Sequence, residues 1–235
     1  MAITSSAEIV DLGSMPLREL NQRLHDLADG TSGPTRWRVQ NPSGTHAVAA
    51  GVDAEVEIEI EGHVGYYCAG MNKRATVRVR GNAGPGVAEN MMSGVVIVDG
   101  NASQSAGASA HGGLLVVHGD ASARCGISLK GADIVVRGSV GHLSGFMAQT
   151  GRLVVCGDAG EALGDSIYEA RIYVLGRPAG LGADCVEKEL RDEHRAELRT
   201  LLDRAGIDGV DPADFRRFGS ARQLYNFKID NVGEY

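Results

Sequence analysis

The sequence predicts an all-β solenoid, a right-handed parallel β-helix with 19-residue coils, flanked by helices at both ends. Two observations support this fold class. A short aliphatic strand pattern recurs along the chain, with two outer apolar residues around a middle residue, as in the period-2 alternation of β-strands. Each run is followed by a glycine, and these glycines recur with one constant 19-residue period: Gly62, Gly81, Gly100, Gly119, Gly138, Gly157 and Gly176.

A second column of small residues follows the first by seven positions. Alanines occupy it in the early coils, and glycines occupy it later, at Gly107, Gly126, Gly145 and Gly164. We expect both columns to form corners, where a positive φ or a close backbone approach excludes a Cβ atom. A leucine-rich repeat is the alternative at this period, but the sequence lacks its leucine frame and its Asn or Cys ladder.

The inner strand positions predict two core ladders along the solenoid axis. Residues such as Ile58 and Ile60 face inward, and their equivalents in the next coils stack about 4.8 Å away. The first coil is less regular, and we align Val48–Gly51 with Tyr67–Gly70 at the same 19-residue shift. The solenoid is therefore predicted to span residues 37–186.

Residues 1–36 precede the solenoid and are predicted to contain a helix and a linker. Four leucines from Leu17 to Leu27 lie on one helical face, with Ser14 as N-cap and Gly30 at the end. The helix either caps the open first coil, whose strand edge could otherwise pair with another chain, or docks on a partner subunit.

Residues 187–235 are predicted to form helices and a tail. An amphipathic helix is expected from Glu187 to Ala205, followed by Gly206 as its C′ residue. Asp211 and Pro212 predict the start of a second, short helix.

The middle strand residues predict an unusual apolar stripe on the outside of the solenoid. This position is charged in the first coils but apolar in the last five, and contiguous exposed apolar surface usually marks a contact. The cover is either the chain's own C-terminal helix or another protein. With the aromatic residues of the tail, the partner-interface candidates are Ile97, Val116, Val135, Val154, Tyr173, Phe215, Phe218, Tyr225 and Phe227.

Composition argues against several partner classes. The net charge is −7, which disfavours nucleic acid and anionic membranes. No run of eighteen apolar residues and no signal-peptide pattern are visible, so we expect a cytoplasmic location. The four cysteines have no CxxC spacing, and the seven histidines form no i, i+4 pair. We predict no catalytic, cofactor-binding or metal-binding residues in this chain.

The glycine pattern, as in Gly138–Gly145 and Gly157–Gly164, resembles the GXGXG domain, the C-terminal β-helix of the glutamate synthase large subunit. As a free-standing chain with a tail such as Gly219–Lys228, it looks most like the β-helix subunits of N-methylglutamate synthase (methylamine–glutamate N-methyltransferase). The resemblance implies a complex that joins methylamine to L-glutamate and releases ammonia. It also implies two partners, a class II glutamine amidotransferase-like subunit and an FMN-binding glutamate synthase-like subunit, with FMN and an iron–sulfur centre in a partner chain.

The resemblance implies a non-catalytic scaffold role for this chain, which could also wall a passage between the two partners. Three alternatives remain at this point. The first is a glutamine-dependent glutamate synthase-like complex, the second is a β-helix subunit of formylmethanofuran dehydrogenase, and the third is an independent carbohydrate-active β-helix.

Overall fold

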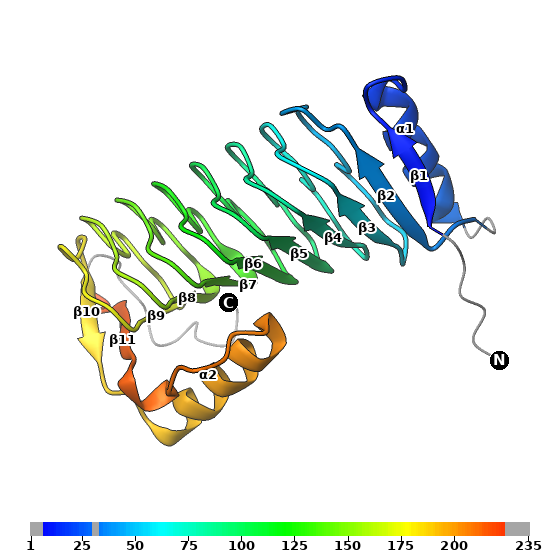
Figure 1. The fold of residues 1–235 in the computed structure, drawn as a ribbon. Coiled ribbons are helices and arrows are strands. Elements are labelled where there is room, and N and C mark those ends of the chain that lie inside the picture. Colours follow the sequence, from blue (N-terminus) through cyan, green and yellow to red (C-terminus); the bar gives the residue numbers. More distant parts are fainter. Residues whose placement is uncertain (1–6, 30–32, 224–235) are drawn as a thin grey trace.

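The computed structural model describes residues 7–29 and 33–223 and confirms the parallel β-helix (Figure 1). One strand of each coil contributes to a long parallel sheet. Its members are β1 (Glu8–Asp11), β2 (Arg36–Gln40), β3 (Glu57–Ile60), β4 (Thr76–Val79), β5 (Val95–Val98), β6 (Leu114–Val117), β7 (Lys130–Val136), β8 (Thr150–Val155) and β9 (Arg171–Val174). Two further strands, β10 (Cys185–Lys188) and β11 (Arg216–Ser220), complete an eleven-stranded sheet.

The strand register confirms the 19-residue coil from β3 to β9. Ile58 pairs with Val77 and Leu153 pairs with Ile172, so each inner residue meets the one that follows it by a full period. The two inner ladders predicted from the sequence are buried throughout and form one continuous core. Stacking therefore buries apolar faces that no single coil could bury by itself.

The first coil is longer than predicted. Trp37 pairs with Ile58, and this spacing exceeds the regular period by two positions. Further along the coil, Ala69 N–H donates to Val48 O, whereas Ala88 N–H donates to Cys68 O in the next coil. Val48 is thus equivalent to Cys68, and the predicted alignment of Val48–Gly51 with Tyr67–Gly70 is wrong by one position.

The two glycine columns exist for different physical reasons. The second column has positive φ, for example +66° at Gly107 and +67° at Gly126. Most of the first column does not, but a Cβ atom on Gly138 would lie 2.7 Å from the carbonyl oxygen of Gly119 in the preceding coil. The first column therefore allows the backbones of successive corners to touch.

A polar ladder follows the first glycine column on the outside of the solenoid. A side-chain atom in each coil accepts a hydrogen bond from the backbone N–H of the equivalent residue in the next, at 2.7–3.0 Å. The accepting residues are His63, Asn82, Asn101, Asp120, Ser139 and Asp158. No such ladder was expected from the sequence, because this column mixes residue types that share only a short side-chain acceptor.

The N-terminal segment closes the first coil with a strand as well as a helix. β1 pairs in parallel with β2, and α1 (Leu17–His25) buries Leu20 and Leu24 against the solenoid core. A 3₁₀ turn, η1 (Asp26–Asp29), follows α1. The N-cap is Pro16 instead of Ser14, and Gly30 lies outside the described residues.

Asn21 on α1 substitutes for the missing preceding coil. Its amide nitrogen donates to Ala47 O at 2.9 Å, and its amide oxygen accepts from Ala49 N–H at 3.1 Å. In the next coil, the backbone donor of Ala69 is satisfied by Val48 of the coil before it. The side chain thus replaces the backbone groups that a preceding coil would supply, and it gives Ala49 N–H a partner at the end of the core.

Replacing Asn21 with alanine should therefore lower the free energy of unfolding by about 1–2 kcal/mol, because it leaves Ala49 N–H of the first coil without its partner and removes one of the two hydrogen bonds to Ala47 O. Urea unfolding would measure the loss, and amide exchange at Ala49 should accelerate. The matched control is Gln22→Ala, since within residues 7–29 and 33–223 the Gln22 side chain bonds only to exposed Asp26. Equal stability of the two variants would contradict this capping role.

The C-terminal segment differs from the prediction at its start. Glu187 lies in β10, and α2 spans Asp192–Ala205, with Gly206 left-handed as expected. Asp211 caps the short helix η2 (Pro212–Asp214), as predicted. β11 then inserts between β9 and β10 and is antiparallel to both. The chain itself therefore supplies the strands that cover the edge of β9.

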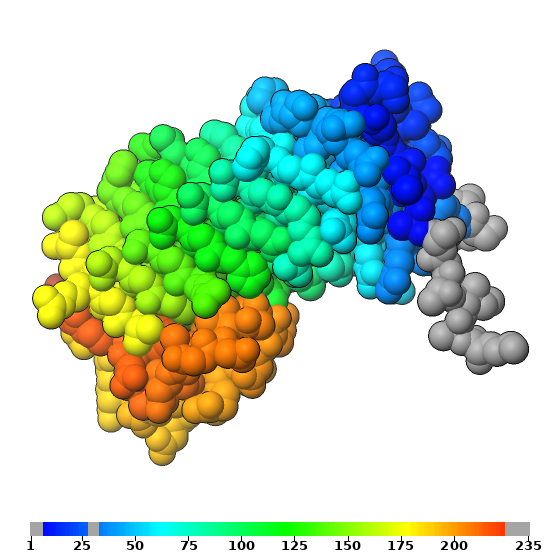
Figure 2. Space-filling view, in the orientation of Figure 1, coloured from blue at the N-terminus to red at the C-terminus, as the bar shows by residue number. Residues whose placement is uncertain are grey.

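Helix α2 covers the outward apolar stripe, as Figures 1 and 2 show along the later coils. Leu198, Leu201 and Leu202 pack on the stripe in a second core, separate from the solenoid interior. This corrects the interface candidates. Val116, Val135, Val154 and Tyr173 are at most 1% exposed, and Phe215 and Phe218 at most 3%, which leaves them no surface for another protein.

Two groups of interface candidates remain. Ile97, at the end of the stripe, packs against this second core but is only half-buried, and it stays a prediction. Tyr225 and Phe227 lie outside the described residues.

Candidate functional site

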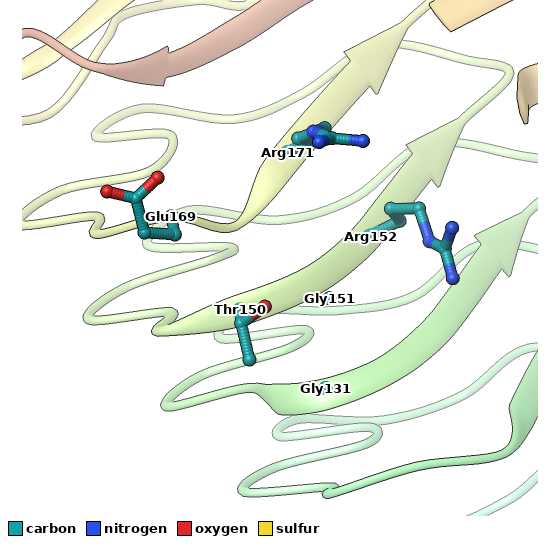
Figure 3. A pocket seen from close by; sticks show the side chains of 6 residues that line it. All are labelled: Gly131, Thr150, Gly151, Arg152, Glu169 and Arg171. Atoms are coloured by element: carbon teal, nitrogen blue, oxygen red, sulfur yellow. The ribbon is translucent and has the colours of Figure 1, made fainter. Parts of the chain in front are cut away.

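A hollow of about 260 Å³ lies where β7, β8 and β9 begin, beside α2 (Figure 3). Its lining is polar and contains no apolar side chain. The residues are Gly131, Thr150, Gly151, Arg152, Glu169 and Arg171. We take this hollow and the ion pairs next to it as the candidate functional site.

Two glycines leave part of the hollow without side chains. Gly131 and Gly151 have φ values of +142° and +98°. A Cβ atom on either would lie 2.4 Å from a backbone oxygen, His111 O and Ala132 O respectively. Neither position can therefore carry a side chain without displacing the neighbouring coil.

The hollow also coincides with a break in strand register. Lys130 pairs with Thr150, one position beyond the regular period, whereas Asp133 pairs with Arg152 at the regular period. Among the strand pairs of the described residues, only β7 and β8 show such a shift. Bulges of this kind bend a strand and re-aim its side chains, and they are common beside functional sites.

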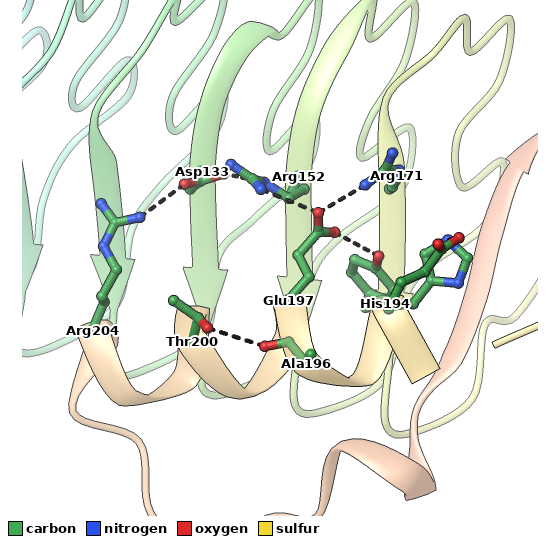
Figure 4. Close-up of polar contacts among 10 residues, drawn as sticks. Asp133, Arg152, Arg171, His194, Ala196, Glu197, Thr200 and Arg204 are labelled. Atoms are coloured by element: carbon green, nitrogen blue, oxygen red, sulfur yellow. Dashed lines mark hydrogen bonds and ion pairs between the residues drawn. The ribbon is translucent and has the colours of Figure 1, made fainter. Parts of the chain in front are cut away.

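An ion-pair network connects the hollow to α2 (Figure 4). Arg152 Nε lies 2.5 Å from Asp133 Oδ1, and Arg204 Nη1 of α2 lies 3.2 Å from Asp133 Oδ2. The Asp133 side chain is only 7% exposed. Two guanidinium groups thus compensate one buried carboxylate, as burial of a charge requires.

Glu197 of α2 is the second centre of this network. Its Oε2 accepts from Arg171 at 2.7 Å and from Arg152 at 3.2 Å, and the Tyr173 hydroxyl donates to its Oε1 at 2.7 Å. Burial would raise the pKa of Glu197, but Tyr173, Arg171 and Arg152 outweigh burial and lower this pKa. Burial and the bond to Glu197 raise the pKa of Tyr173. The contacts therefore keep Glu197 ionised and fasten α2 to the sheet.

His194 caps the first turn of α2. Its Nδ1 accepts a hydrogen bond from the backbone N–H of Arg191 at 3.1 Å, so the neutral ring carries its proton on Nε2. The residue is 5% exposed. Burial, followed by the charges of Arg217 and Arg171, lowers the pKa of His194 below 6.5, although Glu193 and Glu197 oppose the shift.

Protonation of His194 should therefore destabilise the fold. The unfolded state binds this proton more readily than the native state, so the free energy of unfolding should fall as pH drops from 7 through 6.5 towards the lowered pKa. His194→Gln retains an acceptor for the cap and should flatten this slope. Urea titrations of both proteins from pH 7.5 to 5.5 would test it, and parallel slopes would contradict it.

The cysteines belong to the scaffold and not to this site. Cys68, Cys125 and Cys185 are buried free thiols, and Cys156 is half-buried. Burial raises the pKa of Cys68 and of Cys125 to about 12. Such thiols are poor nucleophiles at neutral pH.

The residues of this site were not predicted from the sequence. None of the predicted turn glycines or interface candidates lines the hollow, although Tyr173 contacts Glu197. A sequence signal for the site was present at the strand position immediately before the first inner ladder. Val95 and Leu114 are apolar there, whereas the next three coils carry Asp133, Arg152 and Arg171.

The described residues lack two further kinds of feature. They contain no group of three His, Cys, Asp or Glu side chains placed to hold a metal ion. No helix in the described ranges is both long enough and apolar enough to span a bilayer.

Comparison with known proteins identifies one relative over almost the whole chain. Protein GlxC of Rhizobium meliloti (strain 1021) is 57% identical over 227 residues, which cover 97% of this chain and 99% of that protein. No protein-family model matches the sequence.

Proposed function

The chain belongs to the family of Protein GlxC, and on this premise we propose that it is a β-helix subunit of a glutamate synthase-like complex made of several chains. One observation carries the proposal. The regular 19-residue register of the inner ladders from β3 to β9 bears the glycine pattern that resembles the β-helix domain of glutamate synthase. Function in this view depends on what the solenoid holds and not on a reaction that it performs.

The finer form of the proposal is N-methylglutamate synthase. The complex would join methylamine to L-glutamate, releasing N-methyl-L-glutamate and ammonia, in the cytoplasm. A class II glutamine amidotransferase-like subunit and an FMN-binding subunit would carry the chemistry, and this chain would hold them at a fixed distance. Support comes from the rigid stacking of the coils and from capping at both ends, which suit a spacer.

The fastening of α2 also supports a scaffold role. The charged groups of the candidate site bond to one another across β7, β8, β9 and α2. A carboxylate that binds two guanidinium groups and a hydroxyl is held in place and kept ionised, which makes it a poor general base. We therefore assign Glu197 and Asp133 to structure and not to proton transfer.

Purification from native cells with a tag on this chain tests the proposal. We expect two larger chains to co-purify, identified by mass spectrometry as amidotransferase-like and flavin-containing proteins. The complex should form N-methylglutamate from methylamine and glutamate, and this chain alone should not. Recovery of this chain without a flavoprotein would contradict the complex. Activity with glutamine but not methylamine would retain the complex and replace the proposed reaction.

A further inference from the structure

We propose that the hollow, together with Lys130, Arg152 and Arg171, is a docking surface for an acidic segment of a partner protein. The identity of that partner as a subunit of the complex rests on the proposed function, but the surface itself is argued from its charge and geometry.

The charge around the hollow is opposite in sign to that of the whole chain. The charged lining residues and their ion-pair partners comprise four arginines and three carboxylates: Arg152, Arg171, Arg204 and Arg222 with Asp133, Glu169 and Glu197. Lys130 does not line the hollow, but it pairs in register with the lining residue Thr150 and adds a fifth positive charge. The net excess of two positive charges lies on a protein whose net charge is −7. Complementarity with an acidic partner follows from this local excess.

The arginines of the hollow retain unused hydrogen-bonding capacity. A guanidinium group has five N–H donors. Bonds within the described residues engage Nε and Nη1 of Arg152 and Nη1 of Arg171. The two side chains remain 33% and 46% exposed. Carboxylates of another molecule can therefore bind these arginines without displacing Glu197.

The remaining groups at the rim favour the same occupant. The Lys130 ammonium and the Thr150 hydroxyl have no polar partner among the described residues, and both residues are exposed. Glu169 would repel an acidic segment, but Arg222 binds its two oxygens at 2.8 and 3.0 Å. The negative charge at the rim is thus compensated.

A protein segment fits the hollow better than a small metabolite does. Small-molecule pockets are mostly apolar and usually exceed about 300 Å³. This hollow is smaller and has no apolar side chain. Arginine is also enriched at protein interfaces. Ion pairs with Asp133 and Glu197 hold Arg152 and Arg171 in place, which reduces the entropic cost of binding.

Peptide binding to the full chain tests the proposal directly. We expect a fluorescent hexaglutamate peptide to bind, with affinity that falls as salt rises, while hexalysine and Gly–Ser peptides do not. Lys130→Glu should weaken binding by about fivefold or more, and Arg171→Gln should weaken it as well. Thermal unfolding of each variant would show that the chain still folds. Lys130 has no polar partner among the described residues, so its substitution should leave stability unchanged.

The matched control is Arg177→Glu. It makes the same change in charge at an exposed residue that ends the polar ladder, away from the hollow. Equal weakening of binding by Lys130→Glu and Arg177→Glu would show that the effect depends only on the net charge of the chain, and it would overturn the proposed docking surface. Absence of hexaglutamate binding would also overturn it. So would free L-glutamate or citrate binding as tightly as the peptide, because the site would then be one for small anions.

Affinity purification separates this inference from the proposed function. If the tagged wild-type chain recovers the amidotransferase-like and flavin-containing chains and Lys130→Glu recovers them equally at raised salt, the docking surface is wrong and the function stands. If hexaglutamate binds the hollow but those chains do not co-purify, the proposed function fails and the docking surface stands.

Discussion

Gly119→Ala should lower the free energy of unfolding by about 3 kcal/mol or more, a large part of the stability of a typical domain. A Cβ atom here would lie 2.1 Å from Asn101 Oδ1 and 2.8 Å from Gly100 O. Asn101 Oδ1 accepts from Asp120 N–H, and Gly119 N–H donates to Gly100 O at 3.0 Å. The methyl group must therefore separate two coils and break a bond of the polar ladder.

Gly219→Ala is the matched control for this prediction. Gly219 is buried and Gly119 is half-buried, but the nearest atoms to the Cβ position of Gly219 are Lys188 Cγ at 3.7 Å and Ala170 O at 4.0 Å, an ordinary contact. We expect a change within about 0.5 kcal/mol. Urea unfolding followed by circular dichroism would compare the two, and amide exchange should show the loss concentrated in β5, β6 and β7. Similar stabilities would mean that close backbone approach does not explain the first glycine column.

Asp133→Ala should lower the free energy of unfolding by about 2–3 kcal/mol. Removing this carboxylate leaves Arg152 and Arg204 without their shared partner at the junction of α2 and the sheet. Loss of one member of a buried ion pair costs about 3–5 kcal/mol, and the partial exposure of both arginines reduces that figure. We also expect easier separation of α2 from the apolar stripe.

Glu57→Ala provides the control at the equivalent position of β3. Glu57 pairs with Arg36 at 3.0 Å, but their side chains are 64% and 58% exposed. Exposed pairs contribute little, so the change should stay within about 0.5 kcal/mol. A double-mutant cycle with Arg204→Ala, which removes the α2 partner of Asp133, should give a coupling of about 1–2 kcal/mol. A coupling near zero would show that the network does not fasten α2.

Much of the solenoid could be predicted from the sequence, because its constraints repeat. Each inner residue such as Val96 or Leu115 packs on the equivalent residue of the next coil, so every coil meets the same requirement at the same position. The glycine columns recur for the same reason. The first coil was misaligned because it meets α1 and β1 instead of another coil, and its length obeys no repeat.

The sequence alone determined the strand period, the buried ladders and the glycine corners of this protein. Each coil packs against a similar coil, so the same type of residue is required at the same position every 19 residues. Only the tertiary structure decided what covers the outward stripe and where charge gathers. Those outcomes depend on α2 folding back so that Glu197 reaches Arg152 and Arg171 and Arg204 reaches Asp133. Each of these contacts occurs once, between residues distant in sequence. No repeating pattern in the sequence therefore indicates it.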